Sequence, residues 1–318
     1  MSSTPPEQSP APEARVSRKL TKAVAGFETA EGAGSRVKRS IGTPGLWNLS
    51  PFLILDYARV RPGEGFPDHP HRGMSTLTYL LEGQMQHEDF TGHVGALRPG
   101  DVQFMTAGRG IVHSEMPAFD EDRPVDAVVL QLWIDLPAAK KMVKPHYQEK
   151  KASQLGHATF DGGSVAIVSG ESHGSVGPVR PVAGTCWFMD FRLLPGGQVW
   201  QPLPEGWTAF VYVLTGTLAV GDGDKVIEPH YTAVFSSDKG ENGVLLRKPS
   251  GKQETRFVLV AGEPLNQPVI QQGPFVTTSK EAAVQALRDY DGYRNGFEKA
   301  RGWSSTIGNP GRRPAKKR

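Results

Sequence analysis

The chain has 318 residues, of which 38% are hydrophobic and 22% are charged, and its formal net charge is +3. This composition is typical of a folded globular protein long enough for two domains, and the small charge gives no sign of a nucleic-acid-binding protein. A single cysteine excludes an internal disulfide and a thiolate-rich metal site, and no apolar run reaches the roughly 18 residues of a membrane-spanning helix, so we expect no contact with a membrane.

Both ends of the chain have the composition of tails. Residues 1–34 begin with the proline-rich stretch MSSTPPEQSPAPEA, which lacks the apolar core of a secretory signal, and we expect a disordered tail there. Residues 305–318 form a second expected tail, which ends in RRPAKKR with five basic residues in seven. Such a cluster is typical of a nuclear-localisation signal and equally of a solvated basic terminus.

Between the tails, short strand-like runs alternate with turns. In residues 35–150, runs such as FLILDYARV and VDAVVLQLWI are separated by turn clusters such as RPGEGFP. Short strands at turn-separated intervals predict a β-sandwich or a β-barrel. Residues 151–180 are glycine-rich, and we expect an irregular connection there that contains one short strand, SVAIVSG.

An internal repeat relates the two halves of the chain. Residues 61–85 align with residues 194–218 at a constant offset of 133, so that Tyr79 matches Tyr212. A repeat of this length implies two copies of one β domain, and the second copy is expected over residues 181–304.

One helix is expected near the end of the second copy. The stretch TSKEAAVQALRDY has the spacing of an amphipathic helix, and Val284 and Leu287 share the face that we expect to pack on a barrel.

Two pairs of residues have the spacing of metal ligands. His69 and His71 lie in PDHPHRG, and His113 and Glu115 lie in GIVHSE, 42 residues after His71. Side chains two residues apart on a strand point to the same face. If both strands line one barrel, three imidazoles and one carboxylate converge.

This donor set suits a divalent first-row metal. Imidazole nitrogen with one carboxylate oxygen fits iron, manganese, nickel or copper, and zinc remains open. In the second copy, the offset puts Pro202 and Pro204 opposite the two histidines of the first pair, and residues 243–246 contain neither His nor Glu. We therefore expect one barrel that binds a metal and one that does not.

Three neighbouring residues have less specific signals. His87 and His93 are expected at the barrel rim or outside the ligand set, because four ligands already suffice. Arg72 could hold a carboxylate, bind a substrate or lie at the surface.

The run HPHRGMSTLTYLLEGQMQHEDFTGHVGALRPGDVQFMTAGRGIVHSE resembles the signature of the pirin family, whose members are bicupins. The segments RSIGTPG, GPFVTTSKE and NGFEKARGW also resemble pirins, so the similarity covers about residues 35–304. The resemblance implies an all-β fold of two tandem cupin barrels of the jelly-roll type, with the C-terminal helix packed on the barrels.

The resemblance also implies a metal and two alternative functions. Pirins hold iron through three His and one Glu, which places iron(II) on His69, His71, His113 and Glu115, with other divalent first-row metals open. Some pirins oxidise the flavonol quercetin with dioxygen, and others act in the nucleus as iron-dependent transcriptional co-regulators.

We therefore expect an enzyme of the quercetin 2,3-dioxygenase type, with Glu115 as its catalytic base, or a co-regulator that binds a transcription factor without catalysis. A flavonol-like molecule with dioxygen, or that transcription factor, would be the partner of a monomer in the nucleus or the cytoplasm.

Overall fold

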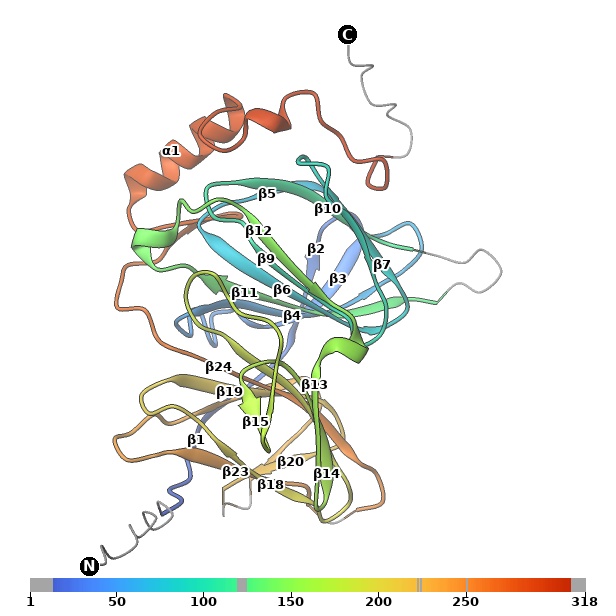
Figure 1. Ribbon diagram of the computed structural model, residues 1–318, viewed down its shortest axis with the longest axis vertical. Helices are drawn as coiled ribbons and strands as arrows, with labels where there is room; N and C mark the ends of the chain where they lie inside the picture. The colour runs from blue at the N-terminus through green and yellow to red at the C-terminus, as the bar shows by residue number, and fades with distance from the viewer. Residues whose placement is uncertain (1–13, 119–124, 222, 224, 250, 310–318) are drawn as a thin grey trace, which may run out of the picture.

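A computed structural model describes residues 14–118, 125–221, 223, 225–249 and 251–309. It consists of two β-barrels stacked along the long axis of the molecule (Figure 1). The predicted all-β fold with two tandem barrels and one α-helix is confirmed for these residues. The basic cluster at 312–318 and the first part of the expected N-terminal tail lie outside them. None of the helices in the described ranges has the length and apolarity needed to cross a bilayer.

The first barrel is formed by a seven-stranded sheet and a four-stranded sheet. The large sheet contains, in spatial order, β12 (His146–Lys150), β9 (Val102–Thr106), β6 (Met74–Glu82), β11 (Ala127–Asp135), β4 (Phe52–Val60), β3 (Ser35–Ile41) and β2 (Phe27–Glu31). The small sheet contains β5 (Phe66–His71), β10 (Ile111–Pro117), β7 (Met85–Asp89) and β8 (Val94–Leu97).

The second barrel repeats this plan. Its large sheet contains β1 (Leu20–Ala25), β22 (Tyr231–Phe235), β19 (Thr208–Thr215), β24 (Thr255–Gly262), β17 (Trp187–Leu193), β14 (Gly163–Ser169) and β13 (Gly156–Phe160). Its small sheet contains β18 (Gln198–Pro202), β23 (Gly243–Arg247), β20 (Leu218–Val220) and β21 (Val226–Ile227).

The remaining elements are short. They are the hairpins β15 (Glu171–Ser172) with β16 (Ser175–Val176) and β25 (Ile270–Gln272) with β26 (Phe275–Thr277), the helix α1 (Lys280–Asp291), and the 3₁₀ turns η1 (Ala138–Lys140), η2 (Ala152–Gln154) and η3 (Glu298–Ala300).

Strand β1 precedes the first barrel in sequence but completes the second. Leu20 pairs with Phe235 on β22, and the chain then crosses to the first barrel at β2. The tail predicted for residues 1–34 is therefore wrong over β1 and β2. Both are edge strands with few large apolar residues, so their sequence resembles a polar linker.

Two other predicted boundaries are also wrong. The strand expected in SVAIVSG is present as β14, but β13 precedes it, and both belong to the second large sheet rather than to a connection. The tail expected from residue 305 starts with a packed segment, because Ser305 is fully buried and its backbone N–H donates to Asp68.

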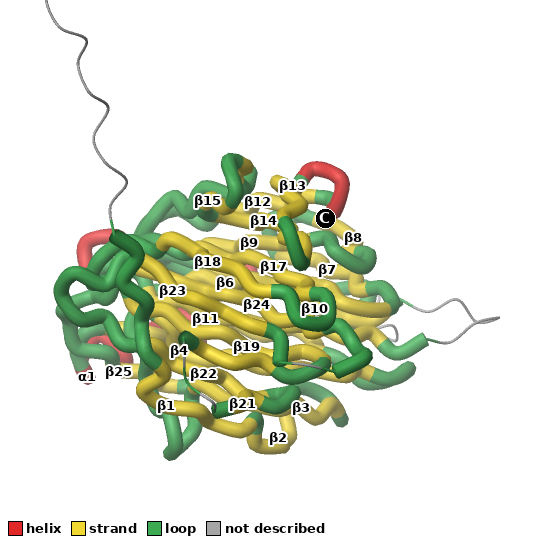
Figure 2. The backbone as a smooth tube through the Cα atoms, turned by 90° about the horizontal axis from the view of Figure 1, so that it is seen from below, coloured by secondary structure: helices red, strands yellow, loops and turns green. Residues whose placement is uncertain are grey.

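The two large sheets pack face to face, and their outer faces form one apolar core. The rings of Phe52 and Phe210 meet edge to face at 5.2 Å between centroids, and those of Tyr79 and Phe188 meet at 5.3 Å. Figure 2 shows that most strands of the two barrels run in the same general direction, as in an aligned sheet packing. The central strands therefore bury both faces, which explains the nearly continuous apolar sequence of β11, whereas β6 also buries serine and threonine side chains.

Helix α1 packs on the first barrel through small residues. Val284 and Leu287, predicted to form the packing face, are both exposed, so that prediction is wrong. The buried residues of the helix are Ala283, Ala286 and Asp289. Small side chains let the helix approach the β25–β26 hairpin, and the acid forms an ion pair beneath it.

A buried ion pair fastens this helix to strand β5. Arg72 Nη1 lies 2.9 Å from Asp289 Oδ2, and both side chains are buried. The same guanidinium donates to the backbone oxygens of Arg109 (2.7 Å) and Asn295 (2.6 Å). Of the roles left open for Arg72, the structure supports the binding of a carboxylate.

Asp289→Ala should lower the free energy of unfolding by about 3–5 kcal/mol, because it leaves the buried Arg72 charge without its partner. The measurement is the urea-unfolding midpoint. Val284→Ala, at an exposed position of the same helix, should stay within about 0.5 kcal/mol of the parent. An unchanged midpoint for the Asp289 variant would show that the ion pair does not hold the helix.

Candidate metal centre

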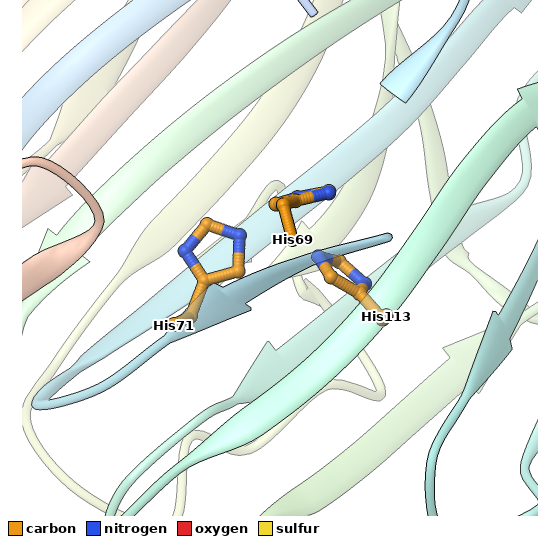
Figure 3. A group of neighbouring side chains, drawn as sticks. All are labelled: His69, His71 and His113. Atoms are coloured by element: carbon orange, nitrogen blue, oxygen red, sulfur yellow. The ribbon is translucent and has the colours of Figure 1, made fainter. Parts of the chain in front are cut away.

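Three imidazoles converge inside the first barrel. His69 and His71 lie on β5, and His113 lies on the adjacent antiparallel strand β10, where it pairs directly with His69. The ring centroids are 4.4 to 5.0 Å apart, and one nitrogen of each ring lies within 4.8 Å of the other two. Figure 3 shows the three side chains gathered around one point.

The ring nitrogens of His71 and His113 have no hydrogen-bond partner among the described residues. His71 and His113 are each 1% exposed, and none of their ring nitrogens forms a hydrogen bond with a described residue. Burial, together with the neighbouring imidazoles, lowers the pKa of both rings well below the ordinary value, so both are neutral and each has a lone pair. Neutral, buried, unpaired nitrogens fit a bound divalent metal.

His69 is oriented by its own strand. Its Nδ1 lies 2.8 Å from the carbonyl oxygen of Pro67. Because a carbonyl can only accept, Nδ1 donates its proton to Pro67, and Nε2 is the nitrogen left to face a metal. A hydrogen bond of this kind is common behind metal-ligating histidines, where it fixes the tautomer and the ring plane.

Glu115 lies beside the three imidazoles, and two polar side chains hold it. Its Oε2 is 3.9 Å from His113 Nε2 and accepts a hydrogen bond from Gln131 Nε2 at 3.1 Å. Thr78 Oγ1 lies 3.1 Å from Glu115 Oε1 and 2.6 Å from Gln131 Oε1, so its single proton is shared between them. The structure therefore brings three of the four predicted ligands together, and the Glu115 carboxylate lies beside this group rather than within it.

The second barrel is filled where the first is polar. The predicted offset of 133 is wrong by one residue on β18, because Pro202 is exposed and the buried positions facing the core are Val199, Gln201 and Leu203. Gln201 pairs with Val244, as His69 pairs with His113 in the first barrel. None of these core positions is a His or a Glu, so the expected asymmetry between the barrels remains.

A cavity of about 480 Å³ opens onto His69, His71 and Glu115. One wall is apolar and comes from the strands of the large sheet. Its residues include Val37, Ile54, Ala58 and Val129. The site is therefore accessible to a molecule larger than water.

Charged residues line the cavity on the side of β2 and β3. Arg39 donates to both carboxylate oxygens of Asp56, at 2.8 and 2.6 Å, and to Glu31 Oε2 at 2.7 Å. Burial disfavours the charge of Arg39, but its bonds to the two acids outweigh burial and raise its pKa. These residues carried no recognisable sequence signal, since each is one charge within an ordinary strand.

His87 and His93 lie outside this group but are not merely at the rim. Their Nε2 atoms are 2.6 and 2.8 Å from Glu149 Oε1 on β12. Burial works against the charge of Glu149, but hydrogen bonds from His87, Gln103 and His93 lower its pKa to about 2. Glu149 was missed in the sequence because it lies 56 residues after the nearer histidine.

Comparison with known families covers both barrels. The family profile described as Pirin matches residues 34–134, and that described as the Pirin C-terminal cupin domain matches residues 188–296. These ranges fall on the first and second barrels, and they identify both as cupin domains.

Individual relatives cover nearly the whole chain. Pirin of Homo sapiens is 48% identical over 297 residues, which is 92% of this chain and 99% of that protein. A pirin-like protein of Solanum lycopersicum is 48% identical over 276 residues, which is 86% of this chain and 92% of that protein. A solved structure of quercetin 2,3-dioxygenase from Acinetobacter baumannii superposes with a TM-score of 0.79 at 30% identity and covers 87% of this chain and 98% of that one.

His113→Ala should remove one equivalent of tightly bound divalent metal, with a loss of affinity of at least about 100-fold, because it deletes one of the converging donors. Elemental analysis after dialysis measures this. His157→Ala, at an exposed histidine of the second barrel, should keep the parental metal content. Equal metal in parent and His113 variant would show that the imidazoles do not hold it.

Proposed function

The chain belongs to the pirin family, and we propose that it is a metal-dependent dioxygenase of the quercetin 2,3-dioxygenase type. One observation carries the proposal: the cavity of about 480 Å³ opens directly onto His69, His71 and Glu115. Ligand pockets are typically about 300–1,000 Å³, so a three-ring flavonol has room there. The similar structure from Acinetobacter baumannii, described as a quercetin 2,3-dioxygenase, supports the same reaction class.

We assign the metal to His69, His71, His113 and Glu115, and the metal itself to iron(II). The donor set of imidazole nitrogens and one carboxylate suits a divalent first-row metal, and the family resemblance favours iron within that group. A bound metal of this kind would lower the pKa of a coordinated enolic hydroxyl and offer a position for dioxygen.

Glu115 is the base in this proposal. Its carboxylate takes the proton of the flavonol 3-hydroxyl, and Gln131 and Thr78 hold it in the orientation that this transfer needs. In the complete reaction both atoms of dioxygen enter the ring-opened product, and one carbon of the flavonol leaves as carbon monoxide.

The rest of the cavity suits an aromatic substrate. Ile54, Ala58, Met85 and Val129 offer an apolar surface that would contact flat rings and exclude water. Trp133, which also lines the cavity, packs edge-on against His71 at 5.1 Å between ring centroids and limits the movement of that imidazole.

The alternative is an iron-dependent nuclear co-regulator that binds a transcription factor without catalysis. It would use the same ligands, and the basic cluster at 312–318 could address it to the nucleus. An open cavity beside the ligands favours the enzyme, because a protein that only senses a metal needs no room for a three-ring molecule.

Glu115→Gln should keep much of the metal and lower quercetin turnover by roughly 10²–10⁴-fold, the usual contribution of a general base. The measurement is dioxygen-dependent loss of quercetin together with release of carbon monoxide, at matched metal content. Glu254→Gln, at an exposed acid of the second barrel, should retain parental turnover.

Parental turnover in the Glu115 variant would reject Glu115 as the base. A parent protein that carries iron but neither consumes quercetin nor releases carbon monoxide would reject the dioxygenase itself.

A further inference from the structure

A second group of three ligating side chains meets in the first barrel, away from the cavity. The Nε2 atoms of His87 and His93 and a carboxylate oxygen of Glu149 all lie within 4.8 Å of one another. We propose that these three residues form a second metal site, which binds a divalent cation of the zinc type and fastens strand β12 to the β7–β8 hairpin.

Three side-chain nitrogens contact the same carboxylate oxygen of Glu149. His87 Nε2, His93 Nε2 and Gln103 Nε2 lie 2.6, 2.8 and 3.0 Å from Glu149 Oε1. The two imidazole rings stack at 5.5 Å between centroids and 19° between planes, and the Nε2 atoms of both rings contact the same oxygen. The side chains are therefore already oriented towards a common point.

The group has unpaired polar atoms and an open side. Gln103 Oε1 is buried without a hydrogen-bond partner among the described residues, and His87 Nε2 is buried in close contact with Glu149 Oε1 but outside normal hydrogen-bond geometry. A Cβ at Gly95 on β8 would collide with His87 Nε2 and approach Glu149 Oε2 to 2.9 Å. The glycine therefore leaves space beside both donors.

An ion can reach this group from solvent. The side chain of His87 is 3% exposed, whereas those of Glu149 and His93 are 27% and 34% exposed. Two atoms that bind one ion lie a few tenths of an ångström further apart than two hydrogen-bonded atoms. The partly exposed side chains of Glu149 and His93 have room for that movement. Two imidazoles with one carboxylate form a zinc set that leaves a fourth position for water.

The location gives this site a structural role. Glu149 lies on β12, the edge strand of the large sheet, whereas His87 lies on β7 of the small sheet and His93 follows it in the turn to β8. In the described part of the chain, no strand ladder joins β12 to β8. An ion held by all three residues would cross-link the two sheet edges.

The second group is next to the first but separate from it. His87 pairs with Glu115 across the β10–β7 ladder, so the two groups flank strand β10 within one barrel. Neither His93 nor Glu149 belongs to the three-histidine group. Variants of these two residues can therefore be read independently of His113→Ala.

The test compares zinc binding by the parent protein, His93→Ala and Glu149→Gln, with His146→Ala as the control, since His146 is an exposed histidine on the same strand β12. Each protein is stripped of metal, loaded with zinc, dialysed and analysed for zinc per chain. We expect His93→Ala and Glu149→Gln to bind one equivalent less than the parent, and His146→Ala to match the parent. Zinc should raise the melting temperature of the parent by roughly several degrees more than that of either variant, because a ligand that binds the folded state stabilises it.

A second measurement uses the His113→Ala background. There, one equivalent of zinc should remain, and adding Glu149→Gln should remove it. If His113→Ala alone abolishes all zinc binding, or if the His93 and Glu149 variants bind as much zinc as the parent, Glu149 is merely hydrogen-bonded to two imidazoles and the second site does not exist. Melting curves of the metal-free proteins identify any variant that fails to fold. If the Glu149 variant fails, the zinc content of His93→Ala decides, because His93 is the most exposed of the three residues.

Discussion

The face-to-face packing of the two large sheets is the constraint on which the rest of the structure depends. Their outer faces form one apolar core that runs through both barrels, with Phe52 against Phe210 and Tyr79 against Phe188. At about 25 cal/mol for each Å² of apolar surface removed from water, burial on this scale dominates the stability of the molecule. Strand β1 also links the two barrels, because it pairs with β22 of the second barrel and the chain continues from it directly into the first barrel.

Because the outer faces hold the barrels together, the inner faces are free to differ. The second barrel is packed with aliphatic and aromatic side chains, among them Leu203 and Val244. The first barrel instead carries a smaller apolar cluster, a cavity, and four buried imidazole nitrogens on His71 and His113 without a hydrogen-bond partner among the described residues. Each such group costs roughly 1–3 kcal/mol, and a bound metal would remove that cost for one nitrogen of each ring.

The convergence of the three histidines could be predicted because a strand has a strict period of two. His69 with His71, and His113 with Glu115, could each be placed on one face from spacing alone. The residues that hold Glu115 could not be found in this way. Thr78 is one of three small hydroxyl residues in STLTYLL, Gln131 is the single polar residue in VVLQLWI, and nothing local says which carboxylate they meet. The sequence did not predict that β1 joins the second barrel, because its partner β22 lies more than 200 residues away and pairing over that distance leaves no local pattern.

The C-terminal segment holds the strand that carries two of the three clustered histidines. Alternate residues of β5 point in opposite directions, so the strand that carries His69 and His71 inward presents Asp68 outward, and Arg72 follows at its end. Arg72 binds Asp289, and Asp68 accepts hydrogen bonds from Ser304 Oγ at 3.0 Å and Asn309 Nδ2 at 2.9 Å.

The two imidazoles are thus fixed from behind by residues more than 200 positions away. Metal ligands bind tightly when they are held before the ion arrives, since less freedom is then lost on binding. In this fold the last helix and the segment after it supply that rigidity, although neither contributes a ligand.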